Sequence, residues 1–134
     1  MERRFHMYKI AKIMLVAFSV IFAGCASSPS YTSLKGMPAD VPLQTVELTG
    51  DNCEWVPSTI KVEKGSHVIL KIKSVDWDYN FRMKGYDLHF EIPKGETVTA
   101  EFYTPDQGEF EFGCYIEEGL RYTWGGMVGK VIVE

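Results

Sequence analysis

The C-terminal segment GEFEFGCYIEEGLRYTWGGMVGKVIVE, residues 108–134, decides the fold of this chain. Its first part, ending at Cys114, and its last part, beginning at Met127, both alternate apolar residues with polar or small ones. Such alternation is typical of β-strands. The residues between them are aromatic, acidic and glycine-containing, which favours a loop. The segment therefore predicts two final strands joined by a loop that begins at a cysteine and ends at a methionine.

The same two-residue alternation begins near residue 44 and continues to the C-terminal segment. Turn signals such as EKGS, KGYD, IPKGE and TPDQG interrupt it. Six further strands are expected, namely TVELTG, STIKVEKG, HVILKIKS, YNFRMK, DLHFEI and TVTAEFYT. No helical period of useful length is present. Short, evenly spaced strands predict an all-β, antiparallel Greek-key sandwich or small barrel of seven or eight strands over residues 44–134.

Residues 1–24 have the form of a secretory signal, because a basic start leads into the apolar run IMLVAFSVIFAG. That run is shorter than the ~20 residues of a membrane span. The small residues before Cys25 resemble a bacterial lipobox. This resemblance implies that Cys25 is lipidated and becomes the N-terminus, on the periplasmic or cell-surface face of a bacterial membrane. A plain secretory signal cut near CASS is the alternative.

Residues 25–43 are rich in serine, proline and small side chains, which predicts a flexible tether between the lipid and the domain. Removing residues 1–24 takes away four basic residues and one acidic residue. Of the 14 basic and 18 acidic residues, 10 and 17 remain, a net charge of −7. Nucleic acid is therefore an unsuitable partner, whereas a cation or a basic protein fits.

The strand-like segments also carry a family resemblance. In order, WVPSTIKVEKGSHVILKIKS, IPKGETVTAEFYTPDQGEFEFGC and GGMVGKVIVE resemble a cupredoxin domain over about 80 residues. The similarity is to periplasmic single-domain cupredoxins and to the copper domain of cytochrome oxidase subunit II and nitrous-oxide reductase. It implies a Greek-key cupredoxin-like β-sandwich with a metal site at one pole.

The ligand positions of that family are only partly filled. The first histidine of the pattern S-x-D-V-x-H-x-F falls on Tyr79 in SVDWDYNF, whereas Cys114 matches the cysteine ligand. Met127 lies two places later than the expected methionine. The dinuclear pattern C-x3-C-x3-H-x2-M falls on four positions, of which only the first fits, namely Cys114, Glu118, Tyr122 and Gly125.

Histidine cannot complete an ordinary site. His67 follows a turn at the opposite pole, so we expect it to be a solvated surface residue. His89 alternates with the apolar residues of its strand and should point outward. A blue copper site needs two imidazoles and one thiolate, which this sequence cannot supply.

Cys53 is expected at the same pole as Cys114, on the inward face that it shares with Trp55. One interpretation is a copper site made of Cys53, Cys114 and Met127, with Glu118 as an oxygen ligand, because thiolate and thioether select Cu(I). It would serve electron transfer or copper handling. The other is a Cys53–Cys114 disulfide, the default outside the cytoplasm.

The disulfide would close a loop of about 60 residues and contribute about 4 kcal/mol in the chain-entropy model. The domain would then be a metal-free binding or assembly module. An enzyme is disfavoured, because no nucleophile has a base and an orienting group at a recognisable spacing.

Acidic residues are expected to crowd the loops of the metal pole. They are Glu54, Asp76, Asp78, Glu117 and Glu118. Like charges repel, so a bound cation or a basic redox partner would relieve the crowding.

Lipidation of Cys25 is directly testable. The wild-type protein should partition with membranes, and Cys25→Ala should yield soluble or uncleaved protein, because the lipid carries the anchor. Membrane fractionation with mass spectrometry of the N-terminus measures both. A mutant that distributes like the wild type would rule out the lipoprotein interpretation.

Overall fold

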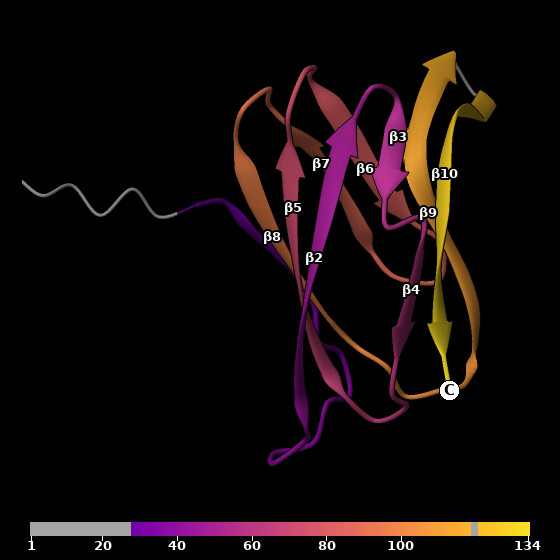
Figure 1. The fold of residues 1–134 in the computed structure, drawn as a ribbon. Helices are drawn as coiled ribbons and strands as arrows, with labels where there is room; N and C mark the ends of the chain where they lie inside the picture. The colour runs from indigo at the N-terminus through magenta and orange to yellow at the C-terminus, as the bar shows by residue number, and fades with distance from the viewer. Residues whose placement is uncertain (1–27, 119–120) are drawn as a thin grey trace, which may run out of the picture.

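The computed structural model describes residues 28–118 and 121–134, and for 116–118 and 121–126 it describes only the backbone. Cys25 and the predicted signal lie outside the described residues. The described chain forms ten strands arranged as a two-layer sandwich (Figure 1). Within this part of the chain, no helix is long and apolar enough to cross a membrane.

The first sheet has the strand order β1-β8-β5-β2-β3. Its strands are β1 (Ser30–Ser33), β2 (Leu43–Asp51), β3 (Glu54–Val56), β5 (His67–Ser74) and β8 (Thr97–Tyr103). The second sheet has the order β4-β10-β9-β6-β7. Its strands are β4 (Thr59–Val62), β6 (Tyr79–Met83), β7 (Leu88–Ile92), β9 (Gly108–Glu118) and β10 (Arg121–Val133).

The predicted all-β sandwich is confirmed, but the expectation of a purely antiparallel fold is wrong. Three neighbouring pairs are parallel, namely β1 with β8, β2 with β5, and β4 with β10. The chain crosses from one sheet to the other between β3 and β4, so strands far apart in sequence become neighbours. Such crossovers are the Greek-key connections that separate sequence neighbours.

The expected flexible tether contributes one of the extra strands. Ser30–Ser33 pairs with β8, and the Tyr31 ring stacks on Phe90 of the second sheet at 4.4 Å between ring centroids. Residues 30–33 therefore belong to the sandwich, which they close along its β8 and β7 edges.

The core is aromatic at its centre. Phe81 and Phe112 stack at 5.4 Å, and Trp55 meets each of them at a steep angle, at 5.9 and 6.0 Å between centroids. Aromatic pairs in these arrangements add about 0.5–1.5 kcal/mol each beyond area burial. Trp55 is 4% exposed, so it forms the buried floor beneath the pole where the cysteines lie.

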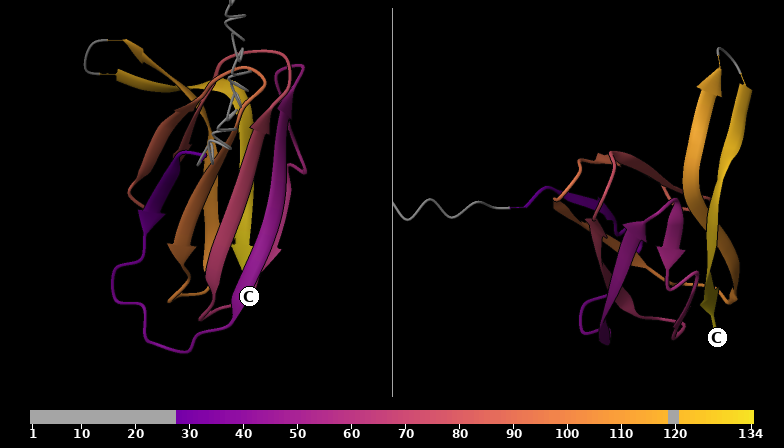
Figure 2. Two further views of the ribbon diagram at one scale, coloured as in Figure 1. Left: turned by 90° about the vertical axis from the view of Figure 1, so that its left-hand side faces the viewer. Right: turned by 45° about the horizontal axis from the view of Figure 1, so that its top comes forward.

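The loop expected between Cys114 and Met127 is largely strand. β9 continues past Cys114 to Glu118, and residues 121–124 of β10 pair with 115–118. The two strands leave the sandwich as a projecting arm, seen from the side in Figure 2. Cys114 therefore lies within a strand and not at its end.

Candidate metal centre

A β-bulge in β10 brings Met127 to Cys114. Trp124 pairs with Tyr115 and Val128 with Gly113, so three residues, 125–127, lie opposite the single residue Cys114. An extra residue bends a strand and redirects its side chains. Here the Met127 side chain turns inward, 4% exposed, and its Sδ lies 3.5 Å from Cys114 Sγ.

Two close approaches hold the bulge in place. The indole Nε1–H of Trp55 donates to the Met127 carbonyl at 3.0 Å in a buried position. Gly113 lies so close to the Met127 backbone that a Cβ atom would collide with the Met127 carbonyl oxygen. Because only glycine permits this approach, residue 113 and Trp55 together determine where the Met127 backbone lies.

Cys114 is half-buried between β9 and β6. Its Sγ donates to the Asn80 carbonyl at 3.2 Å. The Asn80 side chain pairs with the Tyr115 backbone, donating to its carbonyl and accepting from its N–H, both at 2.9 Å. Burial raises the pKa of Cys114, and the charge of the neighbouring Cys53 adds to the increase, whereas a backbone hydrogen bond with Asn80 opposes it. The thiol therefore keeps its proton more readily than an ordinary cysteine does.

The sequence suggested that Cys53 shares a strand face with Trp55, and this expectation is wrong. It occupies the second position of the two-residue turn between β2 and β3, where Asn52 and Cys53 have φ of 51° and 59°. Turns with positive φ at both positions favour Asn-Gly, because glycine has no Cβ to clash. A cysteine in this conformation costs about 1 kcal/mol. Its side chain is exposed at the tip of the turn.

Two hydrogen bonds hold this turn, one to Asp76 in the β5–β6 connection and one to Tyr79 at the start of β6, and a third bond joins these two partners. The Tyr79 hydroxyl accepts from Cys53 N–H at 3.0 Å and donates to Asp76 Oδ1 at 2.6 Å. Asp76 Oδ2 accepts from Asn52 N–H at 3.0 Å.

The pKa shifts of Asp76 and Tyr79 follow largely from these hydrogen bonds. The bond from Tyr79 lowers the pKa of Asp76, whereas burial and the bond to Asp76 raise the pKa of Tyr79 to about 12. Stabilisation from Tyr79 is complete below its ordinary pKa of 10.0 and is lost as the pH rises through about 12. Stabilisation from Asp76 is lost only as the pH falls through its lowered pKa.

Cys53 and Met127 line one groove of about 360 Å³ between β3 and β10. The lining residues are Cys53, Glu54, Trp55, Ser58, Met127 and Val128. Cys53 and Cys114, the two described cysteines, form no disulfide in this structure. Among the described residues, no three His, Cys, Asp or Glu side chains are grouped to hold a metal. The Glu118 side chain lies outside the described side chains, and its role stays a prediction.

Neither of the two described histidines, His67 and His89, lines this groove. His89 is exposed on β7, as expected, and its ring packs edge-on against Tyr115 at 4.7 Å. His67 begins β5 at the far end of the sandwich, but it is not simply solvated. Its Nε2 lies 2.7 Å from Glu101 Oε2, and its side chain is 20% exposed.

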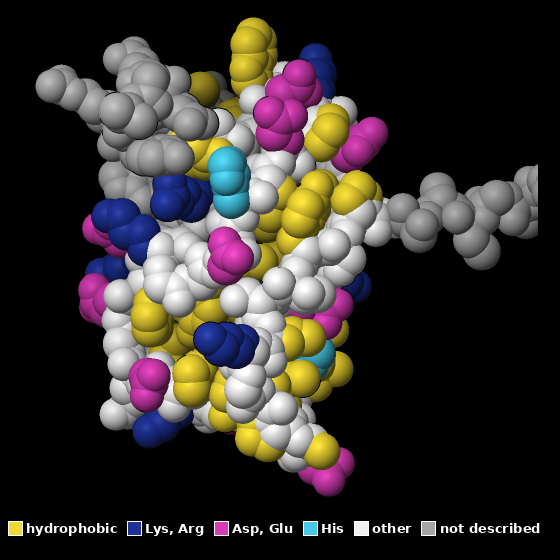
Figure 3. All heavy atoms as spheres, turned by 180° about the vertical axis from the view of Figure 1, so that it is seen from behind, with side chains coloured by type: hydrophobic (Ala, Val, Ile, Leu, Met, Phe, Trp, Pro, Cys, Tyr) yellow, Lys and Arg dark blue, Asp and Glu magenta, His cyan; other side chains and the backbone are white. Residues whose placement is uncertain are grey.

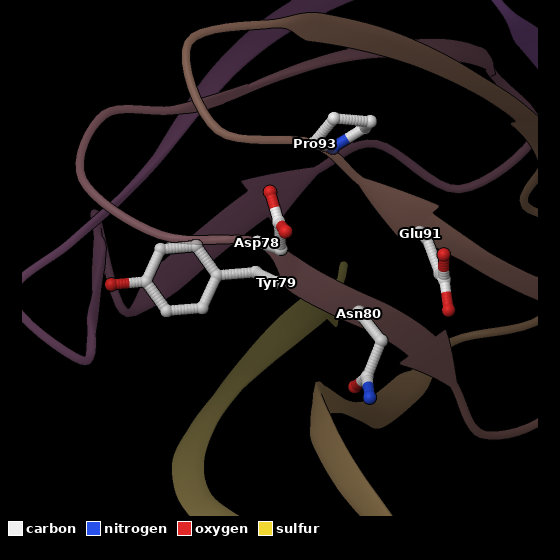
Figure 4. Close-up of a pocket in the computed structure, with 5 residues that line it drawn as sticks. All are labelled: Asp78, Tyr79, Asn80, Glu91 and Pro93. Carbon is white, nitrogen blue, oxygen red and sulfur yellow. The ribbon is translucent and has the colours of Figure 1, made fainter.

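A second hollow of about 240 Å³ lies beside the strand that carries Tyr79 (Figure 4). Its lining residues are Asp78, Tyr79, Asn80, Glu91 and Pro93. In the close-up, the Tyr79 ring points away from Glu91. Asp78 accepts the Lys94 N–H at 2.7 Å, so this carboxylate is engaged in fixing a turn.

Sequence reasoning missed the Tyr79–Asp76 support and the Asn80 contacts. Tyr79 was recognised only as the occupant of a histidine position. The available signal was DNCE between two strand-like runs, since an Asn-x pair between strands indicates a two-residue hairpin turn.

No protein-family model and no curated protein matches the sequence. Solved structures do match. A chain of a heme-copper terminal oxidase dimer is 21% identical with a TM-score of 0.55, and the match covers 68% of this chain and 65% of that one. Auracyanin from Roseiflexus castenholzii is 16% identical with a TM-score of 0.55, and the match covers 68% of this chain and 97% of that one.

The metal-binding domain of the Cu(I)-exporting P-type ATPase CopA from Streptococcus pneumoniae D39, determined with Cu(I), is also similar. It is 14% identical with a TM-score of 0.59, over 81% of this chain and 98% of that one. Identities this low establish the fold alone. The described chain is a cupredoxin-like β-sandwich.

The two thiols should differ in reactivity. In the reduced protein, Cys53 should react with iodoacetamide about tenfold or more faster than Cys114, because Cys114 is less exposed and forms less thiolate. Mass spectrometry of timed samples measures each rate, with Cys53→Ser and Cys114→Ser as controls. Equal rates would contradict this geometry, and a wild-type protein unreactive without reductant would support the disulfide instead.

Proposed function

We propose that this is a lipid-anchored copper-handling protein of the extracytoplasmic face of a bacterial membrane, with a Cu(I) site made of Cys53, Cys114 and Met127. The contact between Cys114 Sγ and Met127 Sδ carries the proposal. Two sulfurs at ~2.3 Å from one tetrahedral ion lie about 3.8 Å apart. The observed 3.5 Å needs only a small adjustment to admit the ion.

The strain at Cys53 supports its role as the third ligand. The turn favours glycine at this position, and nothing in the packing of the exposed Cys53 side chain requires a thiol. Strained positions that persist often serve function. Cys53 shares its groove with Met127 and lies close enough to Cys114 for its charge to affect the Cys114 pKa.

The donor set suits copper handling better than electron transfer. Two thiolates and a thioether are soft ligands that favour Cu(I), whereas Cu(II) prefers imidazole and oxygen donors. The Cys53 ligand stands on an exposed turn, where another protein's thiolate could reach the ion. Electron transfer is the second candidate, favoured by the likeness to auracyanin. Glu118 stays a predicted oxygen ligand, although four residues along a strand place its backbone about 13 Å from Cys114.

A basic protein is the proposed partner of the metal pole. Trp77 and Val75 are 68% and 43% exposed in the β5–β6 connection, next to Asp76 and Asp78. Acidic and hydrophobic side chains gather at this upper end of the molecule in Figure 3. Glu117, by contrast, lies on strand β9 and not in a loop, which corrects the sequence expectation for it and for its neighbour Glu118.

Copper titration tests the site. Reduced wild-type protein should bind Cu(I), with affinity rising with pH, because the Cys114 thiol must lose its proton. Cys114→Ser should lower the affinity by about 100-fold or more, and Met127→Leu by less, because a thioether is the weaker ligand. Competition with a Cu(I)-specific chromophoric chelator measures each affinity.

Cys53→Gly is the sharpest variant. It should raise the free energy of unfolding by about 1 kcal/mol, because glycine relieves the positive φ. It should also weaken Cu(I) binding strongly. Cys53→Ser is the matched control, which keeps the strain and removes the thiol. Absence of Cu(I) binding by fully reduced wild-type protein would eliminate the copper site and leave the metal-free binding module.

Docking of the partner should be electrostatic. With a basic partner protein, the association rate should fall as salt rises through ~0.1 M, where screening acts over ~10 Å. Reversing Glu117 and Glu118, or Asp78, to lysine should slow association, and reversing Glu109 at the far end is the control. Association rates are measured by stopped flow. Rates that respond neither to salt nor to the charge reversals at the pole would contradict a docking role for these acids.

A further inference from the structure

We propose that Tyr79 is the positioning residue of the metal centre, whose hydroxyl group fixes the Cys53 turn so that the Cys53 thiol stays in the groove that Met127 also lines. The inference rests on the proposed copper function and deepens it. Tyr79 occupies the strand position that matches a histidine ligand in the cupredoxin pattern, and the inference says what the tyrosine does there.

The Tyr79 side chain is held rigidly. It is 5% exposed, and its ring lies against Trp55 at 5.9 Å between centroids. The same ring lies so close to Gly50 that a Cβ atom there would be 2.9 Å from it. Since Gly50 precedes the turn on β2, the ring is fixed against the strand that leads into the turn.

The hydroxyl of this fixed ring holds the turn where it is most strained. Asn52 and Cys53 are consecutive non-glycine residues with positive φ. The amide of Cys53 donates to Tyr79 and that of Asn52 to Asp76, and the Tyr79–Asp76 bond joins the two acceptors. The backbone of both turn residues is therefore fastened to one element outside the hairpin.

Tyr79 itself is unsuited to bind the metal. Its oxygen already donates one hydrogen bond and accepts another. The ring of a histidine at this strand position could offer a ligand nitrogen directly. With tyrosine, the position supports a neighbouring ligand instead, and the ligand role moves from β6 to the β2–β3 turn.

Tyr79→Phe tests this by removing only the hydroxyl. Tyr86→Phe is the matched control, because Tyr86 packs against Phe102 and Phe110 at the opposite end of the sandwich. Tyr79→Phe should lower Cu(I) affinity about tenfold, the size typical of a residue that orients a ligand. Tyr86→Phe should leave it unchanged. Asp76→Asn, which keeps the tyrosine, should give a smaller loss and serves if Tyr79→Phe folds poorly.

A double-mutant cycle separates positioning from general destabilisation. If Tyr79 acts through Cys53, Tyr79→Phe should have no further effect on Cu(I) affinity in the Cys53→Ser background. In metal-free protein, amide hydrogen exchange at Cys53 should accelerate about tenfold in Tyr79→Phe and not in Tyr86→Phe, since an exposed amide is protected only by its hydrogen bond.

The outcomes are distinguishable. Unchanged affinity and unchanged Cys53 exchange in Tyr79→Phe, or an equal affinity loss in both backgrounds, would overturn the positioning role and leave the copper site standing. A wild-type protein that binds no Cu(I) would overturn both. If Cys53→Ser binds too weakly for the cycle, the exchange measurement decides.

Discussion

The buried hydrogen bond from the Trp55 indole to the Met127 carbonyl is the constraint on which this pole depends. Trp55 belongs to one sheet and Met127 to the other, so this bond joins the two layers where no strand ladder does. A buried N–H without an acceptor costs about 1–3 kcal/mol, so the bulge cannot relax without a penalty. The bulge in turn puts the Met127 sulfur against Cys114. The shape of the candidate site is therefore a consequence of satisfying one indole.

The second cysteine is held by a different balance. Turn strain of about 1 kcal/mol opposes the conformation of Cys53, and hydrogen bonds worth about 0.5–1.5 kcal/mol each favour it. The carboxylate of Asp76 strengthens its bonds, because a charged acceptor binds more tightly than a neutral one. Met127 is thus fixed by the core, whereas Cys53 is held by hydrogen bonds at the surface. Such an arrangement can release Cys53 without disturbing Cys114 and Met127.

The sequence predicted most of the sandwich, because alternation and turn residues are local signals. It did not predict β1, whose Ser-Tyr-Thr-Ser run is too short and polar to show a pattern and is ordered by pairing with β8. Nor did it predict the parallel pairs, which depend on crossovers between sheets. The metal pole was predicted by residue type and not by geometry. Cys53 was expected on a strand face, yet positive φ at Asn52 and Cys53 places it in a turn.

The missing histidine is thus a change in how the pole is built, and not only a loss. A histidine on β6 would present its ligand nitrogen from within a strand, already fixed by the ladder. A cysteine in a turn has no ladder, so it needs an external support, and Tyr79 supplies one from the same strand position. In the proposed copper site, a thiolate would stand in place of an imidazole, and this change would favour Cu(I). In the proposed site, an exposed and strained Cys53 would lie near the half-buried Cys114 and the buried Met127, an arrangement that would suit an ion that is both held and passed on.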